Sequence, residues 1–211
     1  MKFHIITAFP SMILPVLEES MMKRAIKTGL ITVRVYNLRD YTDNKHKKID
    51  ARPYGGGPGM VLSAEPILRA HKKAKGRKRK VLTVLLSPRG TQWSKDQAVS
   101  FSQKYTDIIL ICGHYEGIDA RVEKILKPLK VSIGPFVLTG GELPALMIVD
   151  SVSRFMSGVL GNEKSLEDSR VSTDELFTRP EVLKWAKKSH KVPPVLLSGN
   201  HERIEKWRSE Q

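Results

Sequence analysis

The part of the sequence that decides the fold is residues 81–117, which read VLTVLLSPRGTQWSKDQAVSFSQKYTDIILICGHYEG. It contains two nearly continuous apolar runs, Val81–Leu86 and Asp107–Cys112, each followed by a turn rich in glycine or proline. The segment between them, Ser94–Gln103, has the composition of a helix. Strands are apolar on both faces when helices cover both sides of a parallel sheet. These residues therefore predict an α/β fold, with a mainly parallel sheet and helices on both faces.

The same alternation continues on both sides of this stretch. Further strands are expected over Phe3–Thr7 and Leu30–Tyr36, and a short apolar run follows at Val131–Ile133. Apolar residues at helical spacing and capping residues predict helices in four more segments. These segments are Met12–Thr28, Leu62–Lys75, Asp119–Leu126 and Glu142–Phe155.

The character of the sequence changes after Val159. Residues 161–177 are polar and have almost no apolar periodicity, which is typical of a linker. Thr178 and Glu181 have the spacing of a helix capping box, which predicts a helix to about Lys188, and a last helix is expected over 201–208. We therefore expect a main domain over residues 1–160, a flexible interdomain linker over 161–177 and a small helical C-terminal domain over 178–211.

Composition narrows the class of protein. The 211 residues include 36 Lys and Arg against 22 Asp and Glu, a formal net charge of +14, and a single cysteine, Cys112. One cysteine excludes a disulfide scaffold and a cysteine-rich zinc site. The N-terminal segment lacks the features of a signal peptide, and no apolar run reaches the roughly 18 residues of a membrane span. We expect a cytoplasmic protein that has no membrane partner.

The positive charge is concentrated in clusters. Residues 71–80, HKKAKGRKRK, contain seven Lys or Arg, and smaller clusters lie at 45–48 and 184–191. A single cluster of this kind is usually a solvated surface. Three clusters together with the net charge favour a nucleic-acid partner, because basic side chains that neutralise phosphates release counterions.

Three loops that follow apolar runs are candidates for a ligand site: Ser87–Gly90, Gly113–Gly117 and Thr139–Pro144. Ligands of open α/β sheets bind at the carboxyl ends of the strands, so these loops could form one pocket, although each could also be only a turn. Phosphate-loop and dinucleotide-binding motifs are absent from the sequence. The glycine-rich segment Gly55–Gly59 suits a backbone that approaches RNA or another subunit closely.

Three further features could carry chemistry. Cys112 ends an apolar run and fits a core residue better than a nucleophile. Arg154 lies among apolar residues of a helix and could bind an anion or carbonyl, or pair with Asp150 four residues earlier. The acidic segment Glu167–Ser169 could supply a general base that substrate orders, or could simply be a polar linker.

The sequence closely resembles the bacterial tRNA (guanine-N1)-methyltransferase family, TrmD, of the SPOUT methyltransferases. The resemblance covers nearly the whole chain, in the order of the family. The matching segments are Arg52–Met60, Leu86–Gly90, Cys112–Asp119, Ser132–Gly134, Leu138–Ala145, Asp150–Phe155, Glu167–Ser169, Phe177–Pro180 and Val192–His201.

The resemblance implies methyl transfer from S-adenosylmethionine to N1 of guanosine 37, just 3′ of the anticodon of tRNA, giving 1-methylguanosine. It implies a deep trefoil knot, a homodimer with shared active sites and a C-terminal domain that binds tRNA. Residues 178–211 are shorter than that domain in typical members. The positions expected to bind the methyl donor are Leu86, Ser87, Pro88, Gly113, Tyr115, Glu116, Gly117, Ser132, Ile133, Leu138, Gly140, Gly141 and Pro144.

The same resemblance assigns two catalytic residues. Asp168 matches the general base, supplied by the partner subunit, and Arg154 matches the residue that organises substrate and stabilises charge. Mg²⁺ is used in the family, but the sequence contains no dedicated metal site. Leu85 and Phe136 stand where many members have tyrosine, so the surroundings of the adenine are expected to remain apolar.

Two alternatives remain at this point. The chain could be an RNA-binding module that keeps the scaffold without catalysis, which the presence of both Arg154 and Asp168 disfavours. It could also be a related knotted methyltransferase with a different RNA target.

Overall fold

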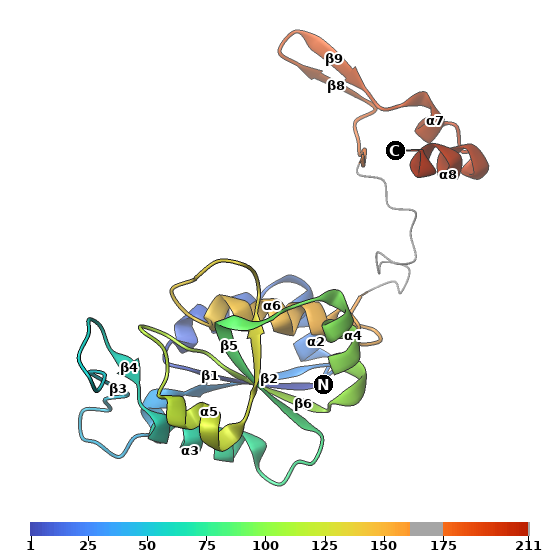
Figure 1. Cartoon of the computed structure of the whole chain (residues 1–211). Coiled ribbons are helices and arrows are strands. Elements are labelled where there is room, and N and C mark those ends of the chain that lie inside the picture. The colour runs from blue at the N-terminus through green and yellow to red at the C-terminus, as the bar shows by residue number, and fades with distance from the viewer. Residues whose placement is uncertain (161–174, 211) are drawn as a thin grey trace. The chain divides into compact units, whose positions relative to one another are not determined.

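The computed structural model describes residues 1–160 and 175–210. The chain divides into two compact units, Met1–Leu160 and Gly161–Gln211 (Figure 1). The expected linker, 161–177, and the acidic segment Glu167–Ser169 fall largely or wholly outside the described residues. Each unit is described by itself below.

The first unit is built on a five-stranded sheet. Its strands are β1 (Lys2–Thr7), β2 (Thr32–Asn37), β5 (Val81–Gln92), β6 (Asp107–Ile111) and β7 (Leu129–Ser132), in the order β2-β1-β6-β5-β7. All four pairings between neighbours are parallel. The predicted parallel sheet is thus confirmed.

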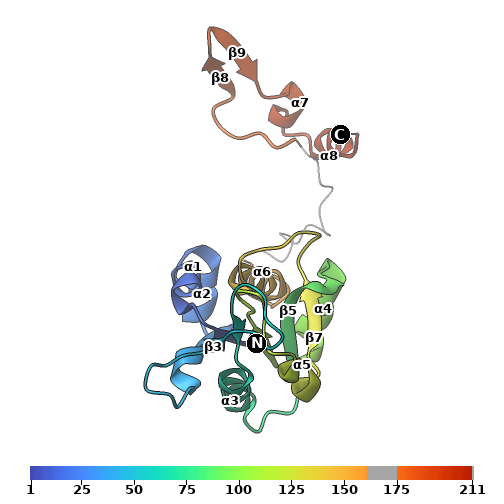
Figure 2. The ribbon, with the colours of Figure 1, turned by 60° about the vertical axis from the view of Figure 1, so that its left-hand side comes forward.

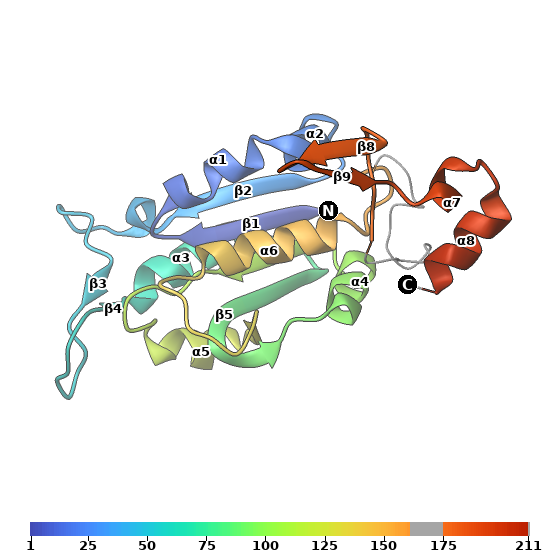
Figure 3. The ribbon, with the colours of Figure 1, turned by 90° about the horizontal axis from the view of Figure 1, so that it is seen from above.

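Helices cover both faces of this sheet, as expected. On one face lie α3 (Ala64–Lys75) and α5 (Ala120–Leu126). On the other lie α2 (Ser20–Lys27), α4 (Lys95–Lys104) and α6 (Glu142–Ser153), and α6 runs along the sheet beside β1 (Figures 1 and 3). Each face has its own apolar core, and β6 contributes buried residues to both. This double burial explains why the strands are apolar on successive residues.

Strand β5 is longer than the apolar run that predicted it. Its pairing with β7 shifts register between Leu86 and Thr91, and both of these residues pair with Val131. The residues between them, Ser87–Gly90, bulge out of the sheet and return to the same neighbour. Gly90 allows the return, because a Cβ at this position would overlap the backbone of Val131.

The predicted helix over Met12–Thr28 is wrong in its continuity. The segment forms a 3₁₀ turn, η1 (Pro10–Met12), then α1 (Leu14–Leu17) and then α2, with Ser20 at a φ of +50°. Pro10 and Pro15 each occupy the first turn of a short helix, where a missing N–H costs nothing. The two prolines thus favour new helix starts over one continuous helix.

A segment between β2 and α3 leaves the sheet and carries the glycine-rich loop. It contains a 3₁₀ turn, η2 (Leu38–Tyr41), and two short antiparallel strands, β3 (Asp50–Ala51) and β4 (Val61–Leu62) (Figure 2). All four glycines of the loop between β3 and β4 have positive φ, namely Gly55, Gly56, Gly57 and Gly59. Pro58 stands between the last two.

The second unit corrects one expectation. Residues 178–188 do not form the predicted helix, because β8 (Val182–Trp185) and β9 (Lys188–Lys191) form an antiparallel hairpin there. Ala186 and Lys187 make its two-residue turn, and both have positive φ. A tight hairpin turn needs positive φ at both residues, because the twist of the turn then matches the twist of the two strands. The capping-box spacing of Thr178 and Glu181 was therefore misleading. The helices α7 (Pro194–Leu197) and α8 (His201–Ser209) follow, the second close to its predicted range.

Among the described residues, the helices are all too short or too polar to cross a membrane. The threading of the chain into a knot stays a prediction.

Candidate functional site

A pocket of about 650 Å³ lies at the carboxyl ends of β5, β6 and β7. This volume is in the range of small-molecule sites in proteins. Three stretches of chain supply most of its lining. They are the bulge after Leu86, the loop Gly113–Gly117 after β6, and the segment 132–144 after β7.

Every residue that the sequence assigned to the methyl-donor pocket lines this pocket. The structure thus brings together Leu86, Ser87, Pro88, Gly113, Tyr115, Glu116, Gly117, Ser132, Ile133, Leu138, Gly140, Gly141 and Pro144. Their role in binding a methyl donor stays a prediction.

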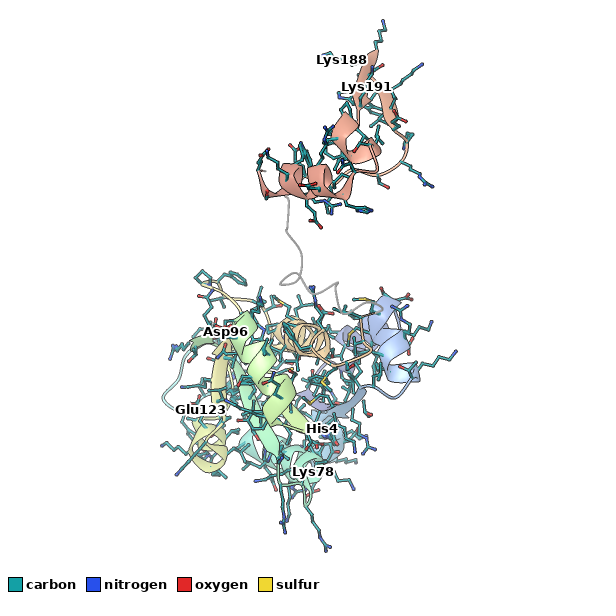
Figure 4. The ribbon with its side chains drawn as sticks, turned by 90° about the vertical axis from the view of Figure 1, so that its right-hand side faces the viewer. His4, Lys78, Asp96, Glu123, Lys188 and Lys191 are labelled. Atoms are coloured by element: carbon teal, nitrogen blue, oxygen red, sulfur yellow. The ribbon has the colours of Figure 1, made fainter. Side chains whose placement is uncertain are left out.

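The pocket also includes polar residues that the sequence did not single out. Lys130 and Glu123 form an ion pair of 3.0 Å at the pocket, and both side chains are partly exposed (Glu123 is labelled in Figure 4). Arg89 lines it as well and belongs to the loop Ser87–Gly90, which the sequence predicted as part of a ligand site. Isolated charged residues on loops and helix surfaces give no signal in a single sequence, because most residues of this kind are only solvated.

Two of the loops are joined directly. The Gly141 N–H donates to the Gly113 carbonyl at 2.8 Å, and His114 and Gly140 form an isolated antiparallel bridge. A Cβ on Gly141 would lie 2.7 Å from the Cα of Cys112, too close for any side chain. The glycine pair therefore lets the two loops pack backbone against backbone, which fixes one side of the pocket.

The glycine-rich loop closes on the same site. A Cβ on Gly59 would lie 2.5 Å from Oε1 of Glu116, so the absence of a side chain makes room for that carboxylate. The Glu116 N–H donates to the Met60 carbonyl at 3.1 Å, and the Leu62 N–H donates to the Gly117 carbonyl at 3.0 Å. At Gly59 the close approach that the sequence predicted is thus to the chain's own pocket loop.

The buried carboxyl group of Glu142 lies beside the pocket, next to His114 of its lining. Glu142, the first residue of α6, is fully buried, and its Oε1 accepts a 2.6 Å hydrogen bond from the hydroxyl of Thr7 at the end of β1. Its Oε2 lies 3.5 Å from Nδ1 of His114, whose ring packs against Phe9 and Tyr115. The sequence signal for this buried group is a glutamate within an otherwise apolar segment, GGELPALMIV.

Cys112 lies in the core, as expected. The side chain is buried at the end of β6. Burial, together with the nearby Glu142 carboxyl group, raises the pKa of the Cys112 thiol well above its usual value. Since the thiolate is the nucleophilic form, this thiol is poorly suited to nucleophilic catalysis.

Arg154, one of the two predicted catalytic residues, does not line this pocket. Arg154 caps the C-terminal end of α6, where its N–H donates to the Asp150 carbonyl at 3.2 Å. The helix begins at the pocket, so at about 1.5 Å per residue Arg154 lies roughly 20 Å along the helix from Gly141. Asp168 falls outside the described residues. The described part of one chain thus does not bring the predicted catalytic cation, Arg154, to the pocket.

A metal site is not evident either. Within residues 1–160 and 175–210, no three His, Cys, Asp or Glu side chains are placed to hold a metal ion. The carboxylates that line the pocket, Glu116 and Glu123, are too few for a magnesium cage, although Mg²⁺ also binds through substrate and water. We therefore assign no step to Mg²⁺.

The fold and the pocket together define an α/β protein that binds its ligand at the carboxyl edge of a parallel sheet. Comparison with known proteins narrows this class. The family model of tRNA (Guanine-1)-methyltransferase TrmD matches residues 1–211. The chain therefore belongs to this family.

Individual relatives agree with the family match. A tRNA (guanine-N(1)-)-methyltransferase of Clostridioides difficile is 44% identical over 224 residues, which cover 100% of this chain and 92% of the relative. The protein of the same description from Caldicellulosiruptor saccharolyticus is 45% identical over 215 residues and is covered to 85%. The crystal structure of tRNA (m1G37) methyltransferase from Aquifex aeolicus is similar with a TM-score of 0.81 at 36% identity, over 100% of this chain and 88% of that one.

Proposed function

We propose that this chain transfers a methyl group from S-adenosylmethionine to N1 of guanosine 37 in tRNA, as a cytoplasmic homodimer. The observation that carries the proposal is the convergence of all the predicted donor-binding positions on one pocket, in a chain that belongs to the tRNA (guanine-1)-methyltransferase family.

The pocket suits a donor of this chemistry. Apolar side chains at Leu86, Ile133 and Leu138 offer surfaces for an adenine ring, while the glycine-rich loops expose backbone N–H and C=O groups for its polar edge. Glu116 supplies an acidic group that suits the positive charge of a sulfonium or an amino group. S-Adenosylmethionine supplies an electrophilic methyl group when bound.

The chain's own residues have to make N1 of the target guanine nucleophilic. N1 of guanine carries a proton at neutral pH, so it is a poor nucleophile until a base removes that proton. Asp168 is proposed to accept it. Negative charge then develops toward O6 of the guanine, where the guanidinium of Arg154 stabilises it. N1 would thereby lose its proton to Asp168 and gain the methyl group, while the bond between that methyl group and the donor sulfur breaks and S-adenosylhomocysteine leaves as a neutral thioether.

The position of Arg154 supports shared active sites. Leu143, Met147 and Arg154 recur at helical spacing on α6, and Leu143 and Met147 are about half exposed. An apolar surface of this kind favours burial against a second copy of the chain. Because Arg154 lies about 15 Å along α6 from Pro144, which lines its own pocket, a partner subunit offers it a pocket to act in.

The experiment that tests the proposal measures transfer of labelled methyl groups to unmodified tRNA with guanosine at positions 36 and 37, against the same tRNA with adenosine at 37. Label is expected only in the guanosine 37 tRNA. Label in both would indicate another target nucleotide. No label, with intact binding of donor and tRNA, would indicate a binding module without catalysis.

Two variants test the catalytic assignments. Asp168→Ala is expected to abolish methyl transfer while calorimetry still detects donor binding, because a base acts on the guanine and not on the donor. Loss of donor binding as well would contradict its role as base. Arg154→Ala is expected to lower turnover in a chain that stays folded, and near-normal turnover would remove Arg154 from the mechanism.

A further inference from the structure

A strongly basic surface lies at the amino ends of the strands β1, β5 and β6, at the end of the sheet opposite the pocket. The C-terminal turn of α3 and the segment that leads into β5 carry exposed cations there. The residues beside β1 and at the end of α4 add more, since Lys2 and Val81 both pair with Asp107 at this edge. We call this surface the basic edge, and it consists of Lys2, Lys72, Lys73, Lys75, Arg77, Arg79, Lys80 and Lys104.

Helix electrostatics accounts for only some of these cations. Lys72, Lys73 and Lys75 lie in the last turn of α3, where a positive charge is stabilised by the helix dipole. Arg77, Arg79 and Lys80 lie beyond the helix. Their side chains make no ion pair or hydrogen bond within the part of the chain that the structure describes. The fold itself therefore gives no reason for these three charges.

Asp107, the acidic group beside these cations, already has partners within the protein. Asp107 is buried and lies 2.9 Å from Nε2 of His4, and it also accepts a hydrogen bond from the Thr106 hydroxyl. Lys78 Nζ lies 3.7 Å from the same carboxylate and donates to the Ala74 carbonyl at 2.5 Å (His4 and Lys78 are labelled in Figure 4).

Lys78 thus fixes the segment to the body of the unit, while its neighbours Arg77 and Arg79 are exposed on either side. The exposed cations face water on a chain segment that is held at both ends, by α3 and by β5. Unpaired cations on a held segment repel each other, and a polyanion removes that repulsion.

We propose that the basic edge binds the sugar-phosphate backbone of an RNA. The proposal rests on the proposed function, because the RNA it refers to is the body of the tRNA substrate, away from the nucleotide in the pocket. Strand β5 joins the two sites: it starts beside Lys80 and reaches the pocket at Leu86, about 20 Å away at 3.3 Å per residue. A tRNA is long enough to contact both.

The test compares two triple variants with equal loss of charge. R77Q/R79Q/K80Q neutralises the three cations beyond α3. K23Q/R24Q/K27Q removes three exposed cations from α2 and is the matched control. The dissociation constant for unmodified tRNA is measured for wild type and both variants between about 50 and 200 mM salt.

Each phosphate contact contributes about 0.7–0.9 to the slope of log affinity against log salt. The slope of R77Q/R79Q/K80Q is therefore expected to be smaller by about 2 than that of wild type, with weaker binding at every salt concentration. The control is expected to keep most of the wild-type slope. Equal slopes for the two variants, or no change in either, would overturn the proposal.

Methyl transfer separates this inference from the proposed function. With saturating tRNA, R77Q/R79Q/K80Q is expected to keep the wild-type kcat and to show only a raised KM for tRNA. If wild type fails to methylate tRNA, the proposed function is wrong, while the salt slopes still decide the role of the basic edge.

Discussion

The hydrogen bond between Thr7 and Glu142 offers a sharp test of how the pocket is supported. Thr7 is fully buried at the end of β1, and its hydroxyl donates to Glu142 while accepting a 2.8 Å hydrogen bond from the Phe9 N–H. Thr7→Val keeps the shape of the side chain and replaces the hydroxyl with a methyl group. Both hydrogen bonds are then lost, and a buried carboxyl oxygen loses its partner.

The expected cost follows from these two losses. A net hydrogen bond contributes about 1 kcal/mol, and leaving a buried polar group unsatisfied costs about 1–3 kcal/mol. Together they predict that Thr7→Val lowers the free energy of unfolding by about 2–4 kcal/mol. For a unit of this size, 1 kcal/mol corresponds to a Tm change of about 2–4 °C, so a loss of 3 kcal/mol lowers Tm by about 6–12 °C.

Thermal unfolding followed by circular dichroism measures this change. Thr32→Val is the matched control, since Thr32 is a half-buried strand residue whose side chain makes no hydrogen bond within the described residues. Its Tm should shift by no more than a surface substitution does. A Thr7→Val shift as small as that of Thr32→Val would refute the view that this hydrogen bond supports the site.

Three further predictions follow from the same geometry. Gly141→Ala should weaken binding of S-adenosylhomocysteine by about tenfold or more, measured by calorimetry, because the new Cβ forces apart the two loops that form one side of the pocket; unchanged affinity would contradict that packing. Burial lowers the pKa of His4 below its usual value, more than the hydrogen bond with Asp107 raises it. The unfolded chain therefore takes up a proton at a higher pH than the folded chain, so stability should fall as pH drops below about 6.5, and His4→Gln should reduce this loss in urea unfolding at about pH 7, 6 and 5; an identical pH slope would argue against it. Cys112 should react with a thiol reagent only after denaturation, because it is buried and its pKa is raised; rapid modification of the native chain would contradict this.

The sequence predicted most of the sheet and the pocket because both depend on local patterns. The apolar runs at Val81–Leu86 and Asp107–Cys112 are buried on both faces, so their composition identifies them as parallel strands. Loops that follow such strands meet at one edge by topology alone. That is why three separate loops could be assigned to one pocket before their geometry was known.

The errors arose where two local signals competed. Between Thr178 and Lys188 a capping-box spacing favoured a helix, but Val182 and Trp185 favour a strand and the turn at Ala186 closes a hairpin. Between Met12 and Thr28 the apolar spacing was helical, but two prolines restart the helix. In both segments the helical pattern is present in the sequence, but a second local preference outweighs it.

The Thr7–Glu142 hydrogen bond could not be predicted from the sequence, for a different reason. The two residues lie 135 positions apart, and only the packing of α6 beside β1 brings them together. A pattern within a short window of sequence contains no information on such a pair.

The way β5 leaves and rejoins its neighbour has a consequence for inhibitor design. Since Leu86 and Thr91 both pair with Val131, the segment Ser87–Gly90 is anchored at each end by the same strand. Another part of the pocket lining, 136–139, is supplied by a segment outside any helix or strand. A rigid compound that takes its affinity from the Ser87–Gly90 side therefore binds a segment that the sheet holds at both ends, and it has little protein conformational entropy to overcome.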